Sequence, residues 1–253
     1  MVTDTDKQRF NECVRNALVG EHRRDSIGTL GERTLHMILK SFLEPDTSYH
    51  EKKLGRYVAD ICRQDEIIEV QTRDFRSLRG KLEAYRGNYN VTVVYPIADM
   101  KYISWLDPDT GELSERHKSP KRGKPWDILY ELYALRLQMP LERVRFMLVF
   151  MHMEEFKLLA GRSRDRKHYG ASRYERIPTE LCGITLLESA SDFAKLIPPT
   201  LGESFTAVEF AAAARMSSRT AGYAVRTLVT LGVIEHTATE KKAYIYTRKN
   251  ATK

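Results

Sequence analysis

Two carboxylates in the first third of the chain have the residue type and spacing for metal-dependent chemistry. Asp60 and Glu69 lie in two short apolar-rich segments, 57–62 and 66–72, which a polar break separates. Such a pair of segments predicts a β-hairpin. With a two-residue turn, Asp60 lies directly opposite Glu69, and opposite Cβ atoms are about 5 Å apart. Carboxylates that close repel each other unless a cation lies between them, and Mg²⁺ or Mn²⁺ suits such oxygen ligands.

Two further residues extend this candidate site. Gln71 shares a strand face with Glu69, because side chains alternate along a strand. Glu32 lies one helical turn before Leu35, at the edge of an apolar stripe that predicts a helix over 30–42. Glu32 is therefore expected to point toward the sheet that this helix covers.

A plainer interpretation of the two acids is also open. They can be solvent-facing strand residues whose charges are balanced by nearby arginines, namely Arg56, Arg63 or Arg73. A shift of one residue in the strand pairing would place Asp60 and Glu69 on opposite faces. The metal site thus depends on the register of the hairpin.

The candidate residues together resemble the motif of the PD-(D/E)XK, or restriction-endonuclease-like, nuclease superfamily: Glu32, Asp60, Glu69 and Gln71. In that family a helix carries a Glu, one strand ends in an Asp, the next strand carries (Asp/Glu)-x-Lys, and a helix and a strand follow. The predicted elements over about 27–97 have this order. The resemblance implies hydrolysis of a DNA phosphodiester, with Asp60 and Glu69 holding one or two Mg²⁺ and Glu32 assisting a metal or the bound water.

The chain departs from the family pattern at the lysine, where it has Gln71. Some members of the superfamily use glutamine there, and others supply a lysine from the following helix, where Lys81 is the matching candidate. Lys52 and Lys53 are weaker matches, and Ala59 replaces the proline that often precedes the Asp. The departure at Gln71 keeps a degenerate, non-catalytic nuclease fold open as an alternative.

The C-terminal segment has the order of elements of a DNA-binding module. Thr206 and Glu209 match a capping box that opens a short helix. The elements predicted after it are a tight turn at 217–218, a helix over 218–231 ended by Gly232, and strands over 233–235 and 243–246 with a polar turn over 236–242. This order resembles the winged helix-turn-helix family over about 205–248.

The winged-helix resemblance implies that the helix over 218–231 enters the major groove of DNA. The residues expected to face DNA are Ser218, Arg219, Tyr223 and Arg226, with Lys241 and Lys242 near phosphates on the wing. Winged helices also serve as protein-interaction modules, and this alternative stays open. The basic and polar character of the exposed helix face favours DNA.

The order of predicted helices and strands gives an α/β (α+β) fold, and the resemblance to the nuclease superfamily implies a restriction-endonuclease-like central mixed sheet flanked by helices. Continuous apolar runs at 90–97 and 144–153 indicate buried strands. Further predictions are helices over 3–21, 75–86 and 126–138, a strand over 101–106 and a loop over 161–177. The expected domains are an α/β domain over 1–160, a basic connector with a linking helix over 161–200, and the winged helix over 201–253.

The formal net charge of +7 is concentrated in three segments. Residues 116–124 carry five positive charges and no acid, whereas 162–176 and 201–253 each carry a net +4. Basic clusters suit a polyanion, because each phosphate contact releases condensed counterions. Tyr169 and Tyr174 lie within the second cluster and are candidates to stack bases. Four other aromatic residues are expected to fill the core: Trp105, Tyr130, Tyr133 and Phe150.

The composition also bounds the class of protein. The chain has no run of 18 apolar residues, no apolar signal-peptide core and three widely spaced cysteines. No phosphate-binding or dinucleotide-binding glycine motif is present. We therefore expect a cytoplasmic protein with DNA as its partner, a homodimer as a further option, and neither membrane contact nor a small-molecule cofactor. The leading function is a Mg²⁺-dependent (or Mn²⁺-dependent) DNA endonuclease, and the alternatives are a non-catalytic DNA-binding regulator and a protein-interaction adaptor.

Overall fold

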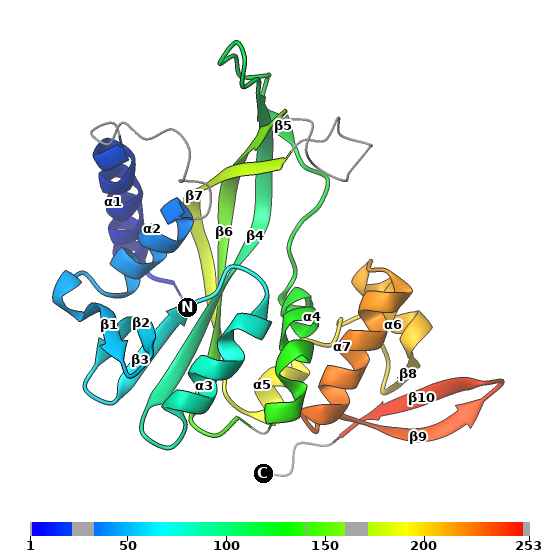
Figure 1. Cartoon of the computed structure of the whole chain (residues 1–253). Helices are drawn as coiled ribbons and strands as arrows, with labels where there is room; N and C mark the ends of the chain where they lie inside the picture. The colour runs from blue at the N-terminus through cyan, green and yellow to red at the C-terminus, as the bar shows by residue number, and fades with distance from the viewer. Residues whose placement is uncertain (1, 22–32, 140, 160–171, 250–253) are drawn as a thin grey trace. The chain divides into compact units, whose positions relative to one another are not determined.

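The computed structural model describes residues 2–21, 33–139, 141–159 and 172–249. These residues form a mixed α/β fold in which helices flank a large mixed sheet (Figure 1). The sheet has seven strands in the order β1-β2-β3-β4-β6-β7, with β5 paired to β4. β1 and β2 are antiparallel, whereas β3 and β4 are parallel. In the part of the chain that the structure describes, no helix is long and apolar enough to cross a membrane.

The elements have the following bounds. The α-helices are α1 (Asp4–Glu21), α2 (Arg33–Leu43), α3 (Arg79–Tyr85), α4 (Ile128–Leu132), α5 (Ala190–Ala194), α6 (Ala207–Ala214) and α7 (Ser218–Thr230). The 3₁₀ helices are η1 (Thr47–Tyr49), η2 (Phe75–Leu78), η3 (Pro125–Asp127) and η4 (Tyr133–Gln138). The strands are β1 (His50–Leu54), β2 (Tyr57–Arg63), β3 (Glu66–Val70), β4 (Asn90–Leu106), β5 (His117–Lys118), β6 (Val144–Leu158), β7 (Ser172–Leu187), β8 (Ser204–Thr206), β9 (Ile234–Glu240) and β10 (Ala243–Arg248).

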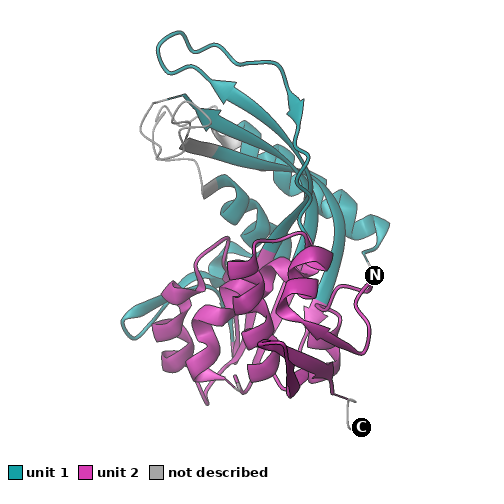
Figure 2. Cartoon of the chain, turned by 90° about the vertical axis from the view of Figure 1, so that its right-hand side faces the viewer, with its two compact units in different colours: residues 1–63, 96–123, 149–185 teal, residues 64–95, 124–148, 186–253 magenta. Residues whose placement is uncertain are grey.

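The contacts within the chain divide it into two compact units, each built from three separate segments (Figure 2). The first unit comprises residues 1–63, 96–123 and 149–185, and the second comprises 64–95, 124–148 and 186–253. The C-terminal helices and strands thus share a unit with β3, α3 and α4. The predicted domain boundaries at residues 160 and 200 stay predictions.

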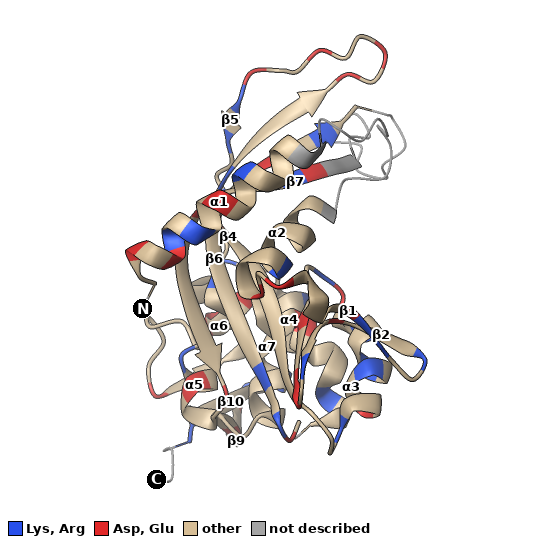
Figure 3. Cartoon of the chain, turned by 90° about the vertical axis from the view of Figure 1, so that its left-hand side faces the viewer, with Lys and Arg blue, Asp and Glu red and all other residues tan. Residues whose placement is uncertain are grey.

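In the first unit, α2 buries the apolar stripe that its helical spacing predicted. Leu35, Ile38 and Leu39 have no exposed surface, and Phe42 is 1% exposed. The ring of Phe42 meets that of Phe10 on α1 edge to face, with centroids 5.3 Å apart. Acidic and basic residues are interspersed along α1, as Figure 3 shows. The two helices are therefore held together by their apolar faces.

In the second unit, β3 pairs in parallel with the beginning of β4, so that Glu69 lies opposite Val93. Parallel neighbours need a crossover connection, and η2 with α3 provides it here. Phe75 anchors this crossover, because its ring stacks on Phe146 at 6.1 Å and meets Tyr95 edge to face at 5.6 Å. The crossover fixes where β3 and α3 present their polar side chains.

The C-terminal elements begin and end as their capping residues predicted. The Thr206 hydroxyl accepts the Glu209 N–H, and the Glu209 carboxylate accepts the Thr206 N–H, so the capping box is confirmed. The Ser217 hydroxyl accepts the Thr220 N–H at the start of α7. Gly232, at φ +71°, follows the end of this helix. β10 then pairs with β9 on one side and with β8 on the other.

One long strand replaces two predicted ones. The strands predicted over 90–97 and 101–106 are both parts of β4. Between them, Asp99 accepts a hydrogen bond from Arg122 Nη2 at 2.6 Å. The polar residues between the two predicted strands therefore lie within a continuous strand.

The prediction of a loop over 161–177 is wrong at its C-terminal end, because β7 begins at Ser172. The rest of that predicted loop, together with Tyr169, lies outside the described residues. β7 contains charged residues and a proline, so its sequence does not show the apolar pattern that predicts a strand. Partners from elsewhere in the first unit stabilise these charged residues, as where His152 Nδ1 lies 2.8 Å from the Glu180 carboxylate.

A predicted helix and a predicted turn also differ from the observed elements. The single helix predicted over 126–138 is divided into η3, α4 and η4. Tightening into 3₁₀ turns is common at helix ends. The wing turn predicted over 236–242 contains two residues, because β9 continues to Glu240 and β10 begins at Ala243.

Candidate functional site

Asp60 lies on β2 in the first unit and meets a histidine from α2. His36 Nε2 is 3.0 Å from Asp60 Oδ2, and the two side chains are 29% and 16% exposed. His36 was not among the predicted site residues. The plainer interpretation expected an arginine beside Asp60. The group that the structure places 3.0 Å from its carboxylate is instead the imidazole of His36.

A second carboxylate of the first unit belongs to β1, a strand that the sequence did not predict. Glu51 accepts a hydrogen bond from Lys40 Nζ at 2.8 Å, and this bond holds the pKa of Glu51 below its ordinary value. The charge of Asp60 also acts on Glu51. His36 and Lys40 are one helical turn apart on α2. The helix therefore presents two basic side chains to two carboxylates.

Glu69 lies on β3 in the second unit and is 2% exposed. Lys81 Nζ on α3 donates to its Oε2 at 2.7 Å, and the Tyr85 hydroxyl donates to its Oε1 at 3.2 Å. A buried carboxylate is costly unless it is paired and hydrogen-bonded. Lys81 and Tyr85 are four residues apart on one helix face, so α3 supplies both groups.

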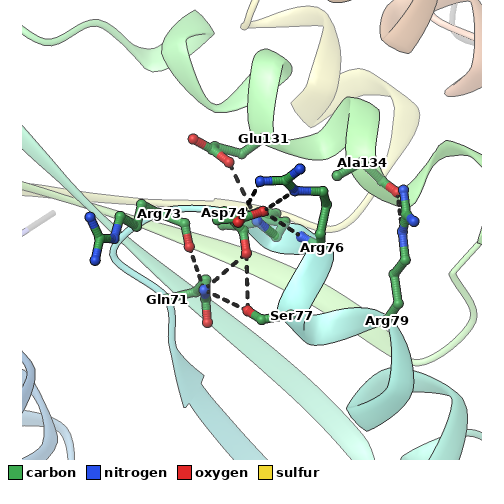
Figure 4. Close-up of polar contacts among 9 residues, drawn as sticks. Gln71, Arg73, Asp74, Arg76, Ser77, Arg79, Glu131 and Ala134 are labelled. Carbon is green, nitrogen blue, oxygen red and sulfur yellow. Dashed lines mark hydrogen bonds and ion pairs between the residues drawn. The ribbon is translucent and has the colours of Figure 1, made fainter. Parts of the chain in front are cut away.

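Gln71 follows β3, and its amide nitrogen points into the loop that leads to η2 (Figure 4). It donates to the carbonyl oxygens of Arg73 and Asp74 and, at 3.0 Å, to the Ser77 hydroxyl. Asp74 is at φ +51°, which is uncommon for a residue with a side chain. Gln71 thus stabilises an unusual loop conformation instead of pointing its amide nitrogen at Glu69.

The same loop contacts a half-buried carboxylate on α4, that of Glu131 (Figure 4). The Phe75 N–H donates to Glu131 Oε2 at 3.4 Å. Burial raises the pKa of Glu131. Arg76 pairs with Asp74 at 2.6 Å, and this hydrogen bond lowers the pKa of Asp74. The loop therefore combines a solvent-facing ion pair with a carboxylate that burial biases toward its neutral form.

The predicted DNA-facing residues of α7 differ in their surroundings. Ser218, Arg219 and Arg226 are exposed. Tyr223 is half-buried, and its ring packs against that of Tyr133 with centroids 4.5 Å apart. Tyr223 therefore contacts protein on one side, whereas the two arginines face solvent.

The prediction that Tyr130 fills the core is wrong, because half of this side chain is exposed. It lies 5.8 Å from the ring of Tyr223, between centroids. Helix α7 is held beside α4 by the Thr227 hydroxyl, which donates to the Leu129 carbonyl at 3.1 Å. Trp126 Nε1 donates to the Ala214 carbonyl at 3.3 Å.

Lys241 and Lys242 form the two-residue turn between β9 and β10. Both are exposed and have positive φ angles of +46° and +69°. Two-residue hairpin turns with both φ angles positive favour Asn and Gly. The turn thus presents two charges in a backbone conformation that lysine rarely adopts.

The structure does not describe every predicted ligand. Glu32 lies outside the described residues, Asp60 belongs to the first unit and Glu69 to the second. Within the described ranges, no three His, Cys, Asp or Glu side chains form a group that could hold a metal ion. The expected Mg²⁺ site and the roles of these residues stay predictions.

Comparison with known proteins reaches the central part of the chain. Residues 33–188 match the family described as "Domain of unknown function (DUF8091)". A protein of Treponema pallidum (strain Nichols), described as uncharacterized, is 35% identical over 154 residues. That stretch covers 60% of this chain and 57% of the relative, so the chain spans less than two thirds of it. No solved structure matches. The matched range contains Asp60, Glu69 and Lys81 and ends before α6.

Proposed function

The chain belongs to the family described as "Domain of unknown function (DUF8091)", and we propose that it is a Mg²⁺-dependent DNA endonuclease. The observation that carries the proposal is the contact of Glu69 with Lys81 at 2.7 Å. An acid on a strand and a lysine on the next helix are groups that the resemblance to PD-(D/E)XK nucleases assigns to catalysis.

The order of elements supports the same proposal. The chain runs through α2, β1, β2, β3, α3 and β4, with Asp60 on β2 and Glu69 on β3. A helix, an Asp-bearing strand, a Glu-bearing strand, a helix and a further strand are the elements of the nuclease pattern. In this chain the helix α3 connects β3 to β4, which pair in parallel, so a helix and a strand follow the Glu-bearing strand as in the pattern.

The donor set fits a hard divalent cation, because Asp60 and Glu69 offer carboxylate oxygens. When bound, Mg²⁺ or Mn²⁺ would activate water and neutralise charge on the phosphate. Lys81 would hold a positive charge beside the reacting phosphate, and Tyr85 would orient Glu69 through its hydroxyl. Glu32 keeps its proposed role of assisting the metal or the water.

The C-terminal elements would bring the DNA to the enzyme. The sequence α6, turn, α7, β9 and β10 resembles a winged helix. The exposed Arg219 and Arg226 on α7, with Lys241 and Lys242 at the turn, support contacts to phosphates.

Cleavage of a supercoiled plasmid with Mg²⁺ or Mn²⁺ tests the nuclease proposal. We expect Asp60→Asn, Glu69→Gln and Lys81→Met to reduce the cleavage rate by about 10²- to 10³-fold, the range for loss of one charge-stabilising group. Glu83→Gln is the matched control, because Glu83 is an exposed carboxylate on α3. Circular dichroism would verify that each variant is folded. Equal cleavage by all four variants would remove these residues from catalysis.

A non-catalytic DNA-binding regulator is the second candidate, and one observation favours it. Glu69 is 2% exposed, and the hydrogen bonds from Lys81 and Tyr85 already satisfy part of its carboxylate. DNA binding without metal-dependent cleavage by the wild-type chain would support this candidate against the nuclease.

A further inference from the structure

Three tyrosines and three arginines form a cluster on α4, η4 and α7 within the second unit, which we call the tyrosine–arginine platform: Tyr130, Tyr133, Tyr223, Arg136, Arg219 and Arg226. The members on α4 and η4 lie about ninety residues before those on α7 in the sequence. Two of the tyrosines, Tyr130 and Tyr133, were expected to fill the core. Tyr130, at 50% exposed, offers the most accessible ring.

Two of the three platform arginines are directed at the rings. The Arg136 guanidinium lies 4.2 Å from the centroid of the Tyr133 ring, and that of Arg219 lies 5.9 Å from the Tyr223 centroid. Arg219 Nε also donates to the Tyr223 hydroxyl at 3.3 Å. The charges of Arg136 and Arg226 act on Tyr223 as well. Cation–π contacts thus gather positive charge around aromatic rings that pack against one another at tilted angles.

Within the described residues, these positive charges have no counterion. Among the residues that the structure describes, no carboxylate forms an ion pair with Arg136, Arg219 or Arg226. Surface arginines in this chain otherwise often have one, as Arg122 does with Asp99. An unbalanced cationic surface attracts an anionic ligand.

The surface also leaves room for a ligand at its centre. Gly222 lies on α7 between Arg219 and Arg226, and a Cβ atom there would have no neighbour within 4 Å. The helix backbone is therefore open between the two arginines. The platform is held in place from below by the buried Thr227, which bonds α7 to α4.

We propose that the tyrosine–arginine platform binds unpaired bases of DNA. Aromatic rings stack on bases of any sequence, and guanidinium groups bind the phosphates between them. This inference rests on the proposed DNA-binding function and specifies its substrate as DNA with a single-stranded segment next to a duplex. An acidic protein surface would satisfy the arginines but would leave the exposed ring of Tyr130 without a stacking partner.

Fluorescence anisotropy of the full-length chain with EDTA present, so that metal-dependent cleavage cannot occur, tests the inference. The probes are a labelled duplex and the same duplex with a single-stranded tail. We expect the tailed DNA to bind more tightly by about 5- to 150-fold, the range for stacking one or more bases. Tyr130→Ala should abolish this preference, and Tyr130→Phe should retain it. Tyr49→Ala, which alters a partly exposed tyrosine on η1 outside the platform, should leave the preference unchanged.

The possible failures are distinguishable. Equal affinity of the wild type for both probes, or an unchanged preference in Tyr130→Ala, would overturn the platform while leaving duplex binding intact. Absence of binding to either probe would overturn the proposed DNA-binding function as well. Displacement of the tailed DNA by polyglutamate as effectively as by oligothymidine at equal charge would overturn base stacking in favour of an acidic protein partner.

Discussion

At the scale of single residues, Lys81 is the group that makes a buried Glu69 tolerable. We expect Lys81→Met to lower the free energy of unfolding by about 1–3 kcal/mol, because it removes a charged partner from a carboxylate that is 2% exposed. Urea denaturation measures the change. Lys53→Met on β1 is the control, because Lys53 is exposed and should change stability by less than about 0.5 kcal/mol. Equal effects of the two substitutions would contradict a structural contribution of the Lys81–Glu69 contact.

Glu131 gives a pH dependence whose sign follows from its burial. Burial raises the pKa of Glu131, so the folded state binds this proton more tightly than the unfolded state does. The stability that this group contributes is present below the unfolded pKa and is lost as pH rises through the folded pKa. We therefore expect Glu131→Gln to be more stable than the wild type at pH 7, with a difference that narrows as pH falls toward about 4.

Glu209 provides the comparison of opposite sign. The Thr206 N–H holds the pKa of Glu209 below its ordinary value, so its contribution is present above the unfolded pKa and is lost as pH falls. Glu209→Gln should be less stable than the wild type at pH 7, and this difference should also narrow in acid. Thermal unfolding across pH 4 to 8 measures both variants. The same sign at pH 7 for both substitutions would contradict the assignment.

At the scale of elements, the turn between β9 and β10 presents two positive charges in a backbone conformation that lowers stability. Replacing Lys241 and Lys242 by Asn and Gly should raise the free energy of unfolding by about 1–2 kcal/mol, because these residues suit positive φ at both positions. The same variant should bind DNA more weakly, since it removes two positive charges. Lys241→Gln/Lys242→Gln is the matched control, because it removes the charges without relieving the backbone. If this control gained as much stability, charge repulsion and not backbone conformation would be the cause.

Elements with strong periodicity or specific capping residues were predictable from the sequence. The apolar stripe of α2 predicted the four large apolar side chains that it buries, and Thr206 with Glu209 predicted the start of α6. The strands β1 and β7 were not predictable in the same way. The pattern of β1 is His-Glu-Lys-Lys-Leu, and the contact of its Glu51 with Lys40 on α2 is a tertiary contact that periodicity cannot indicate.

The candidate site was predictable in its acids and not in their partners. The apolar-rich segments predicted that Asp60 and Glu69 lie on neighbouring strands, and Lys81 was the lysine expected from the next helix. His36 as the partner of Asp60 depends on how α2 packs, which is a tertiary contact. Tyr130 was expected to fill the core, whereas half of its side chain is exposed. Its exposure depends on the position of α7, which lies far along the sequence.

At the scale of the whole molecule, the segment after residue 200 is part of the second compact unit and not an appendage. Thr227 has no exposed surface and bonds to the Leu129 carbonyl, while Trp126 bonds to the Ala214 carbonyl. Helix α4 buries Leu129 and Leu132 completely in this unit. Removal of α6 and α7 would therefore expose apolar surface and leave backbone groups without partners.

We expect a chain truncated to residues 1–200 to lose cooperative unfolding and to bind a hydrophobic dye, because it lacks the helices that cover α4. Urea denaturation of the truncated and full chains measures this. Thr227→Val tests the same contact in the intact chain, and it should cost about 1–2 kcal/mol because it leaves the Leu129 carbonyl without this donor while keeping the side-chain volume. Thr230→Ala is its control, since Thr230 is exposed and bonds within its own helix. A truncated chain with the same midpoint and cooperativity as the full chain would mean that the C-terminal elements fold separately, and they could then be tested for DNA binding in isolation.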